Sequence, residues 1–371
     1  MKLKYIILSF AAIALLAGCS KSRTEVQQPD PAVDPDSDAW VNDESLPVPV
    51  NFASPSIGVD SKAQINDIAD LGPVGILGLD KNGGWGTEEN DEVLIYNKQA
   101  VRSQEEGSWI LKFNPAVYYP MHNNNNYTFY GYHPYKDDMQ YVYQRRYEVT
   151  YDIGHTDIIW AKSEAVPFDN GEVHYDGFNG RYVRAVRNNL GTGTPGVSEP
   201  HFEFSHLLTA LSFNVVSASG ENLETVRVRA IEVTTFTQGT LLVADSQDSE
   251  NWEGKVNPVS GSTGSVKVTG GHSDTGDYRI LPETSPTTVG EAIMLIPADT
   301  YDMKLYMTVN DHEVDPSEYT VIDAVISRDG GFEPGKQYNL TVNVYSPEEI
   351  KISIELTPWD TVEDTPPIEI G

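Results

Sequence analysis

The chain has 371 residues, a length that suits two domains or one large β domain. Hydrophobic residues make up 39%, which is enough for packed cores and excludes wholesale disorder. Asp and Glu total 55 against 25 Lys and Arg, so the formal charge is −30 and argues against nucleic acid as a partner. The single cysteine excludes an internal disulfide and a multi-cysteine zinc site.

The first 19 residues have the pattern of an exported, lipid-modified protein. Two lysines precede the apolar stretch 5–16, which is too short to span a bilayer and suits a secretory signal. The stretch ends in Leu-Ala-Gly-Cys19, which resembles the lipobox of bacterial lipoproteins, where cleavage precedes the cysteine and its thiol receives diacylglycerol. We therefore predict a signal peptide over 1–18 and a lipid anchor at Cys19. An ordinary signal peptide with a chance cysteine is the alternative.

Residues 19–45 predict a lipidated, flexible tether, because apolar residues are sparse there and Pro and Asp dominate the middle. Beyond the tether, short alternating runs are separated by turn residues, and no segment of twelve or more residues carries a clean helical period. This pattern predicts an all-β protein of two tandem β-sandwich domains, 46–200 and 201–371, with a linker near 188–200.

The expected strands lie at 48–52, 74–79, 92–95, 109–113, 127–133, 141–149, 157–161, 210–216, 225–233, 240–243, 265–268, 292–296, 303–309, 318–326, 337–344 and 350–356. In the first of them, Val48, Val50 and Phe52 alternate with Pro47, Pro49 and Asn51. Proline cannot donate to a strand ladder, so this strand is expected at a sheet edge, where it can be lost without dismantling the sheet.

The last two runs predict a hairpin with one buried face. Apolar residues alternate over 338–344, a turn follows at 346–348, and the second run places its apolar residues on one side. Those residues are Ile350, Ile352, Ile354 and Leu356.

Motifs that carry chemistry are scarce. A G-x-G-x-x-G match at 191–196 lacks the strand and helix that a dinucleotide site needs, and no G-x-S-x-G elbow occurs. We expect no catalytic residue, no metal site and no cofactor. A hydrolase that uses a scattered acidic pair is a remaining rival.

Ten of the 20 tyrosines lie between Tyr118 and Tyr151. An exposed platform that stacks on sugars is one interpretation, and it would make the protein a surface glycan-binding lipoprotein. Core packing of these rings is the other interpretation, and the one that strand geometry favours.

Several segments together resemble the fimbrillin (Mfa-like) family of Gram-negative type V pili. The segments are the Cys19 lipobox, the aromatic run 129–134, and the stretches 157–161, 202–211, 332–338 and 358–359. The resemblance implies two transthyretin-like sandwiches and a lipidated precursor at the outer membrane. It also implies that a trypsin-like protease clips a loop after the first strand, which leaves, and that a C-terminal strand of another subunit fills the gap.

Carried onto this chain, the leaving strand would be Val48, Val50 and Phe52. The donor would be 350–356, with the tail 366–370 as an extension, or else 350–356 is a permanent strand of its own sandwich. The loop after the first strand has no arginine and offers only Lys62-Ala63 for cleavage. The chain could therefore be cut after Lys62, cut elsewhere, or left whole as an anchor or accessory subunit.

The resulting hypothesis is a non-enzymatic, lipid-anchored structural subunit of a cell-surface fimbria on the outer membrane. Its expected partners are other fimbrial subunits, in a homo- or heteropolymer, and a host or bacterial surface ligand for adhesion. Shaft, tip and anchor positions all remain open.

Overall fold

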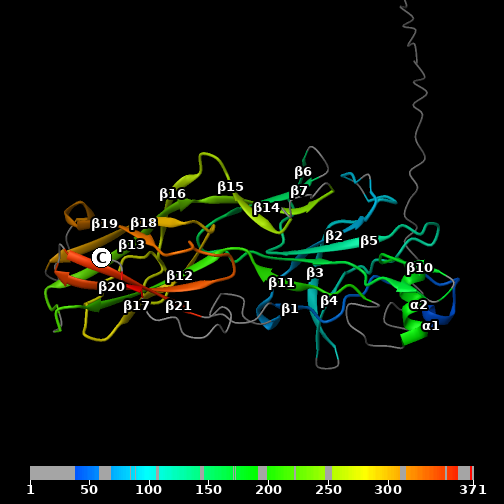
Figure 1. The fold of residues 1–371 in the computed structure, drawn as a ribbon, viewed down its shortest axis with the longest axis horizontal. Helices are drawn as coiled ribbons and strands as arrows, with labels where there is room; N and C mark the ends of the chain where they lie inside the picture. The colour runs from blue at the N-terminus through cyan, green and yellow to red at the C-terminus, as the bar shows by residue number, and fades with distance from the viewer. Residues whose placement is uncertain are drawn as a thin grey trace, which may run out of the picture.

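Strands dominate the protein, and they form two halves that lie end to end along its long axis (Figure 1). The computed structural model describes residues 38–57, 68–83, 85–87, 89–105, 108–142, 146–169, 171, 173–190, 199–220, 223–246, 253–309, 315–346, 349–357 and 368–369. Over these ranges, no helix has the length and apolar character that crossing a membrane requires. The same ranges hold no cluster of three or more His, Cys, Asp or Glu residues suited to a metal ion.

The first half is built from short helices and strands around one long sheet. Its elements are α1 (Ala39–Asn42), β1 (Ser56–Ile57), η1 (Ile68–Asp70), β2 (Val74–Asp80), β3 (Val93–Glu105), β4 (Ser108–Lys112), β5 (Tyr127–His133), β6 (Gln140–Val142), β7 (Arg146–Asp152), β8 (Ile159–Ser163), β9 (Phe168–Asp169), β10 (His174–Tyr175) and α2 (Gly180–Leu190). Six of these strands and β11 (Glu203–His206) form a seven-stranded sheet in the order β1-β11-β8-β5-β2-β3-β4, and β9 and β10 pair separately.

The strand β5 lies at the centre of this sheet and is buried on both faces. Tyr127 and Phe129 point into a core confined to the first half, whereas Tyr130 and Tyr132 point into a second core that continues into the other half. A strand with aromatic residues on both faces is stable only where both faces are covered, so β5 fixes the middle of the sheet.

The second half is a sandwich of two sheets around a common core. Its elements are β12 (Thr209–Ser217), β13 (Val226–Phe236), β14 (Gln238–Asp245), β15 (Lys255–Pro258), β16 (Thr263–Lys267), β17 (Thr287–Leu295), β18 (Thr300–Val309), η2 (Pro316–Glu318), β19 (Thr320–Ser327), β20 (Gln337–Ser346), β21 (Glu349–Thr357) and β22 (Ile368–Glu369). One sheet has the order β17-β12-β20-β21-β22 and the other β16-β13-β18-β19. The expected all-β sandwich architecture is confirmed.

A further sheet, β15-β14-β7-β6, takes two strands from each half. The strands β7 and β14 pair antiparallel from Arg146↔Asp245 to Asp152↔Gln238. Two side-chain contacts reinforce this junction: Trp160 Nε1 donates to Val243 O at 2.9 Å, and Lys162 pairs with Glu253 at 3.0 Å. The domain boundary at residue 200 stays a prediction, and backbone pairing crosses it.

The structure corrects three expectations in the first half. The helix α2 occupies a region for which no helix was expected, and it extends into the expected linker. The last described part of the expected tether, residues 38–45, is packed against the protein, since α1 forms there and Trp40 is only 3% exposed. The single run expected at 141–149 is two strands, β6 and β7.

Candidate functional site

The candidate site is the extended segment 46–57, which we call the N-terminal segment. Its backbone is bonded first to one neighbouring stretch of chain and then to another. The bonds join Tyr119 N to Val48 O, Val50 N to Val117 O, Ala53 N to Pro200 O and Ser56 N to Phe202 O, at 2.8 to 2.9 Å. The segment thus changes partners midway, which explains why it forms few regular strand pairs.

A regular edge strand was expected over 48–52, and the structure shows a single bridge there instead. Pro49 pairs antiparallel with Tyr118, and the flanking bonds make this a non-hydrogen-bonded pair. The missing N–H of Pro49 therefore costs no ladder bond. Regular pairing begins only at β1, which lies parallel to β11 at one edge of the seven-stranded sheet.

Side-chain burial holds the segment more firmly than its backbone does. Val48, Val50 and Phe52 are all buried. The Phe52 ring stacks on Phe202 with centroids 5.2 Å apart and meets Phe129 edge-on at 5.7 Å. Burying side chains of this size contributes about 1.5–3 kcal/mol each, so the segment is bound mainly through its apolar groups.

The segment also connects the two edges of the seven-stranded sheet. At one edge β1 pairs with β11. At the other edge Ser54 Oγ donates to the carbonyl oxygen of Trp109 in β4 at 2.8 Å. Removal of the segment would therefore take these contacts away from both edges and uncover the rings of Phe129 and Phe202.

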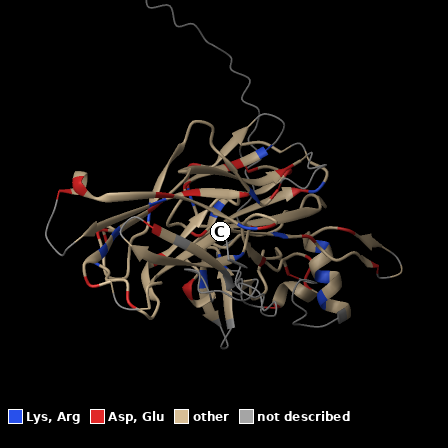
Figure 2. Ribbon diagram, turned by 60° about the vertical axis from the view of Figure 1, so that its left-hand side comes forward, with Lys and Arg blue, Asp and Glu red and all other residues tan. Residues whose placement is uncertain are grey.

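The helix α2 holds the chain that leads into the segment, and Figure 2 shows the blue turns of its basic residues. Arg184 donates from Nε to Trp40 O at 2.9 Å and from a terminal nitrogen to Leu46 O. Arg187 pairs with Asp38, and its guanidinium lies 5.6 Å from the centroid of the Trp40 ring. We call Arg184 and Arg187 the arginine clamp.

Local sequence explains why α2 begins where it does and which way it faces. Asn179 precedes the helix and accepts a hydrogen bond from Tyr182 N at 2.8 Å, as a residue that caps a helix N-terminus does. Tyr182, Val183 and Val186 are buried, so the helix turns the clamp toward residues 38–46.

Next to the clamp, Glu199 lies 3.6 Å from Arg187. Burial raises the pKa of this carboxyl above its usual range, and Arg187 acts in the opposite direction. Glu199 directly precedes Pro200, which bonds the N-terminal segment. Glu199 and Pro200 therefore lie between the clamp and Ala53 of the segment, which links the two.

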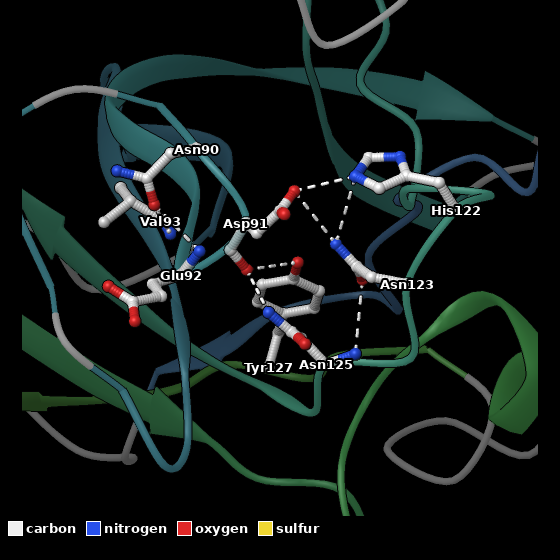
Figure 3. A network of polar contacts seen from close by, with 8 residues as sticks. All are labelled: Asn90, Asp91, Glu92, Val93, His122, Asn123, Asn125 and Tyr127. Atoms are coloured by element: carbon white, nitrogen blue, oxygen red, sulfur yellow. Dashed lines mark hydrogen bonds and ion pairs between the residues drawn. The ribbon is translucent and has the colours of Figure 1, made fainter. Parts of the chain in front are cut away.

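A network of polar contacts joins two loops near residues 117–119, the stretch that is hydrogen-bonded to Val48 and Val50 (Figure 3). Asp91 accepts from His122 Nε2 at 2.7 Å and from Asn123 Nδ2 at 3.1 Å through one carboxylate oxygen. Its main-chain oxygen accepts from Asn125 and from Tyr127, the latter at 2.9 Å. The asparagine-rich run 122–126 lies between two of the expected strands, and its sequence does not predict the network.

The tyrosines between 118 and 151 are mostly core residues. Tyr130 and Tyr132, the rings that would have carried sugar stacking, are 3% and 0% exposed. Tyr130 faces Trp85 and Trp160, with centroids 6.4 and 6.5 Å away. These rings are closed to a ligand, so the core-packing interpretation holds for them.

At the other end of the chain, the predicted hairpin is present. Its strands β20 and β21 pair antiparallel from Gln337↔Thr357 to Ser346↔Glu349. Ile354 is buried, while Ile350 and Ile352 are partly buried against the same core. The side chain of Leu356 lies outside the described residues. Outside β21, two residues of β22 complete the edge.

Three expected site residues lie outside the described ranges: Cys19, Lys62 and Ala63. Lipidation and cleavage therefore stay predictions from sequence.

Comparison with known proteins gives a family match and a fold match. The chain matches a family model described as fimbrillin-like over residues 61–359. No curated protein matches it. It is similar in structure to a candidate cell adhesion protein from Bacteroides uniformis, at 15% identity and a TM-score of 0.50, with 84% of this chain and 98% of that chain covered.

Two further solved structures are more distant. A fimbrial protein from Bacteroides vulgatus has 12% identity and a TM-score of 0.48, with 83% and 99% of the two chains covered. The tip fimbrial protein Mfa3 from Porphyromonas gingivalis, solved with a C-terminal truncation, has 11% identity and a TM-score of 0.39, with 84% and 98% covered. At these identities, a likeness bears on fold alone.

Proposed function

Because the chain belongs to the fimbrillin-like family, we propose that it is a structural subunit of a cell-surface fimbria and contributes to adhesion rather than to catalysis. Its partners are other fimbrial subunits, and a surface ligand where the subunit lies at an exposed position. Cys19 carries the lipid that ties the precursor to the outer membrane.

The subunits assemble by strand exchange, and the N-terminal segment is the part that leaves. The carrying observation is the mismatch between its side chains and its backbone: Val48, Val50 and Phe52 are buried, yet the segment has little regular pairing. Once it departs, the carbonyl groups of Val117 and Pro200 lose their partners and an apolar groove opens. An extended strand with alternating apolar residues satisfies both the groove and the backbone.

The donor comes from the C-terminal end of a second subunit, either β21 with Ile350, Ile352, Ile354 and Leu356, or the tail 366–370. In this structure β21 has nine paired residues with β20, whereas β22 has two with β21. The tail is therefore easier to release, and β21 is the better suited to remain in its own sandwich.

Proteolysis and gel electrophoresis test this function. The unlipidated chain from Ser20 onward is treated with trypsin, and the products are run on SDS-PAGE without boiling. We expect a ladder of multimers and a new N-terminus at Ala63. The Lys62→Gln variant is the matched control and should stay monomeric.

Absence of a ladder after confirmed cleavage at Lys62 would exclude the shaft role and leave the anchor and tip roles. N-terminal sequencing of the protein from cells decides between the roles, because a blocked Cys19 indicates an uncut anchor and a free Ala63 a processed subunit.

A further inference from the structure

The arginine clamp holds the short helix α1 and the turn that follows it mostly through the chain's backbone. Arg184 is bonded to the carbonyl oxygens of Trp40, Asp43 and Leu46. These contacts require no particular side chain, so another segment that folds into the same turns could make them equally well. Two side-chain contacts add selectivity: a carboxylate, Asp38, and an indole ring, Trp40, both on Arg187.

The clamp is also a local concentration of positive charge on an acidic protein. From Gly180 to Leu190, the helix α2 carries three arginines and no acidic residue, while the whole chain carries −30. Figure 2 shows this stretch as a helix with blue turns. Such a surface attracts an acidic segment more strongly than other parts of the chain do.

Two buried donors, one in the clamp and one close to α2, are left unsatisfied by residues 38–46. Within the described ranges, Arg187 Nε and Tyr119 Oη have no hydrogen-bond partner. A buried polar group without a partner is costly, so the present occupant does not use every contact that this site offers.

The C-terminal residues 359–370 repeat the sequence pattern of residues 40–52. In the N-terminal region, Trp40 is followed by six residues with two acids, by Pro47, and then by alternating apolar residues. Near the C-terminus, Trp359 is followed by six residues with three acids, by Pro366, and then by Ile368 and Ile370. The chain has six tryptophans in all, and no Lys or Arg follows Lys351.

We propose that the arginine clamp is a receptor for residues 359–370 of a second copy of this chain. Trp359 takes the place of Trp40 against Arg187, and the acid-rich stretch that follows lies along Arg184. This inference rests on the proposed strand exchange and adds a residue-level site to it. The indole sets how far the incoming tail advances, and so fixes the register of its apolar residues in the groove.

A peptide-binding experiment tests the clamp. The acceptor is the full chain with a specific protease site inserted between Lys62 and Ala63 and then cleaved. The probe is a fluorescent peptide of residues 357–371, and binding is followed by anisotropy. We expect Trp359→Ala in the peptide and Arg187→Gln in the acceptor each to weaken binding roughly tenfold, since each removes the same cation–π contact.

Because both changes remove one contact, combining them should weaken binding little beyond either change alone. Arg184→Gln should also weaken binding and reduce its sensitivity to salt. Arg181→Gln is the matched control, because this arginine lies exposed on the same helix, and it should bind as the wild type does.

The outcomes separate the two proposals. If the wild-type peptide does not bind the cleaved acceptor, strand exchange through this tail is wrong. If it binds and the Trp359→Ala peptide binds equally well, the exchange stands and the clamp is wrong. Equal losses in Arg181→Gln and Arg187→Gln would also overturn the clamp, because they would indicate general charge attraction.

Discussion

The N-terminal segment and the β20–β21 hairpin are both formed by alternating apolar residues near a chain end, yet they are held differently. The hairpin has a ladder of nine residue pairs and one buried face. The segment has buried side chains, three scattered backbone bonds and the two-residue pairing of β1. Burial alone therefore does not distinguish the two regions; the continuity of their backbone pairing does.

The largest expected loss of stability follows from removing Phe52, the side chain that anchors the N-terminal segment in the core. Phe52→Ala should cost about 3–5 kcal/mol in the free energy of unfolding, because it empties a site lined by three other rings. Ile352→Ala on β21 should cost clearly less, since this residue is only partly buried. Urea unfolding of both variants measures the difference, and equal losses would contradict it.

A smaller effect should follow from changes to the backbone of the segment. Val50→Pro deletes the bond from Val50 N to Val117 O and should cost about 1–3 kcal/mol. Pro49→Ala should cost less than Val50→Pro, about 1–2 kcal/mol, because residue 49 makes no ladder bond and the change loses only the packing of its buried ring. Thermal unfolding compares the two, and a larger loss from Pro49→Ala would show that the register is wrong.

The smallest expected effect is a pH dependence of stability that comes from Glu199, next to the residue that bonds Ala53 of the segment. Burial raises the pKa of Glu199, so its carboxyl binds a proton more tightly in the folded chain than in the unfolded one. The stability that comes from this tighter proton binding is fully present below pH 4.5, the usual pKa of a glutamate, and is lost as pH rises through the folded pKa.

The Glu199→Gln variant removes this dependence. The stability of the wild type relative to the variant should therefore decrease from acid to neutral pH in denaturant titrations. Glu203→Gln changes an exposed carboxyl on β11 and serves as control. A relative stability that increases with pH would contradict the assignment.

The elements that sequence predicted well are those whose pattern is complete in itself. The range 127–133 was expected and is β5, and the hairpin was expected with its correct buried face. Alternation reports directly on a buried strand face, and proline and glycine mark the turns.

The helix α2 escaped prediction because its eleven residues are too few for a strong period. The signal was nevertheless there, since Arg181, Arg184 and Arg187 recur every three residues around buried Tyr182 and Val186. A shorter window, centred on the basic residues, would have found it.

The site itself depends on contacts that no local pattern contains. Trp40 was assigned to a tether because a lone aromatic residue among polar ones has no period, and its partner Arg187 is far along the chain. The segment 48–52 alternates like a strand, but its partners lie in two separate stretches near 118 and 201. Only the fold brings these stretches together.

The sheet that takes strands from both halves has a mechanical consequence. Because β7 and β14 are joined by a backbone ladder, bending the protein at residue 200 would require breaking hydrogen bonds rather than flexing a linker. In a fibre of such units, each molecule would transmit tension as a stiff link.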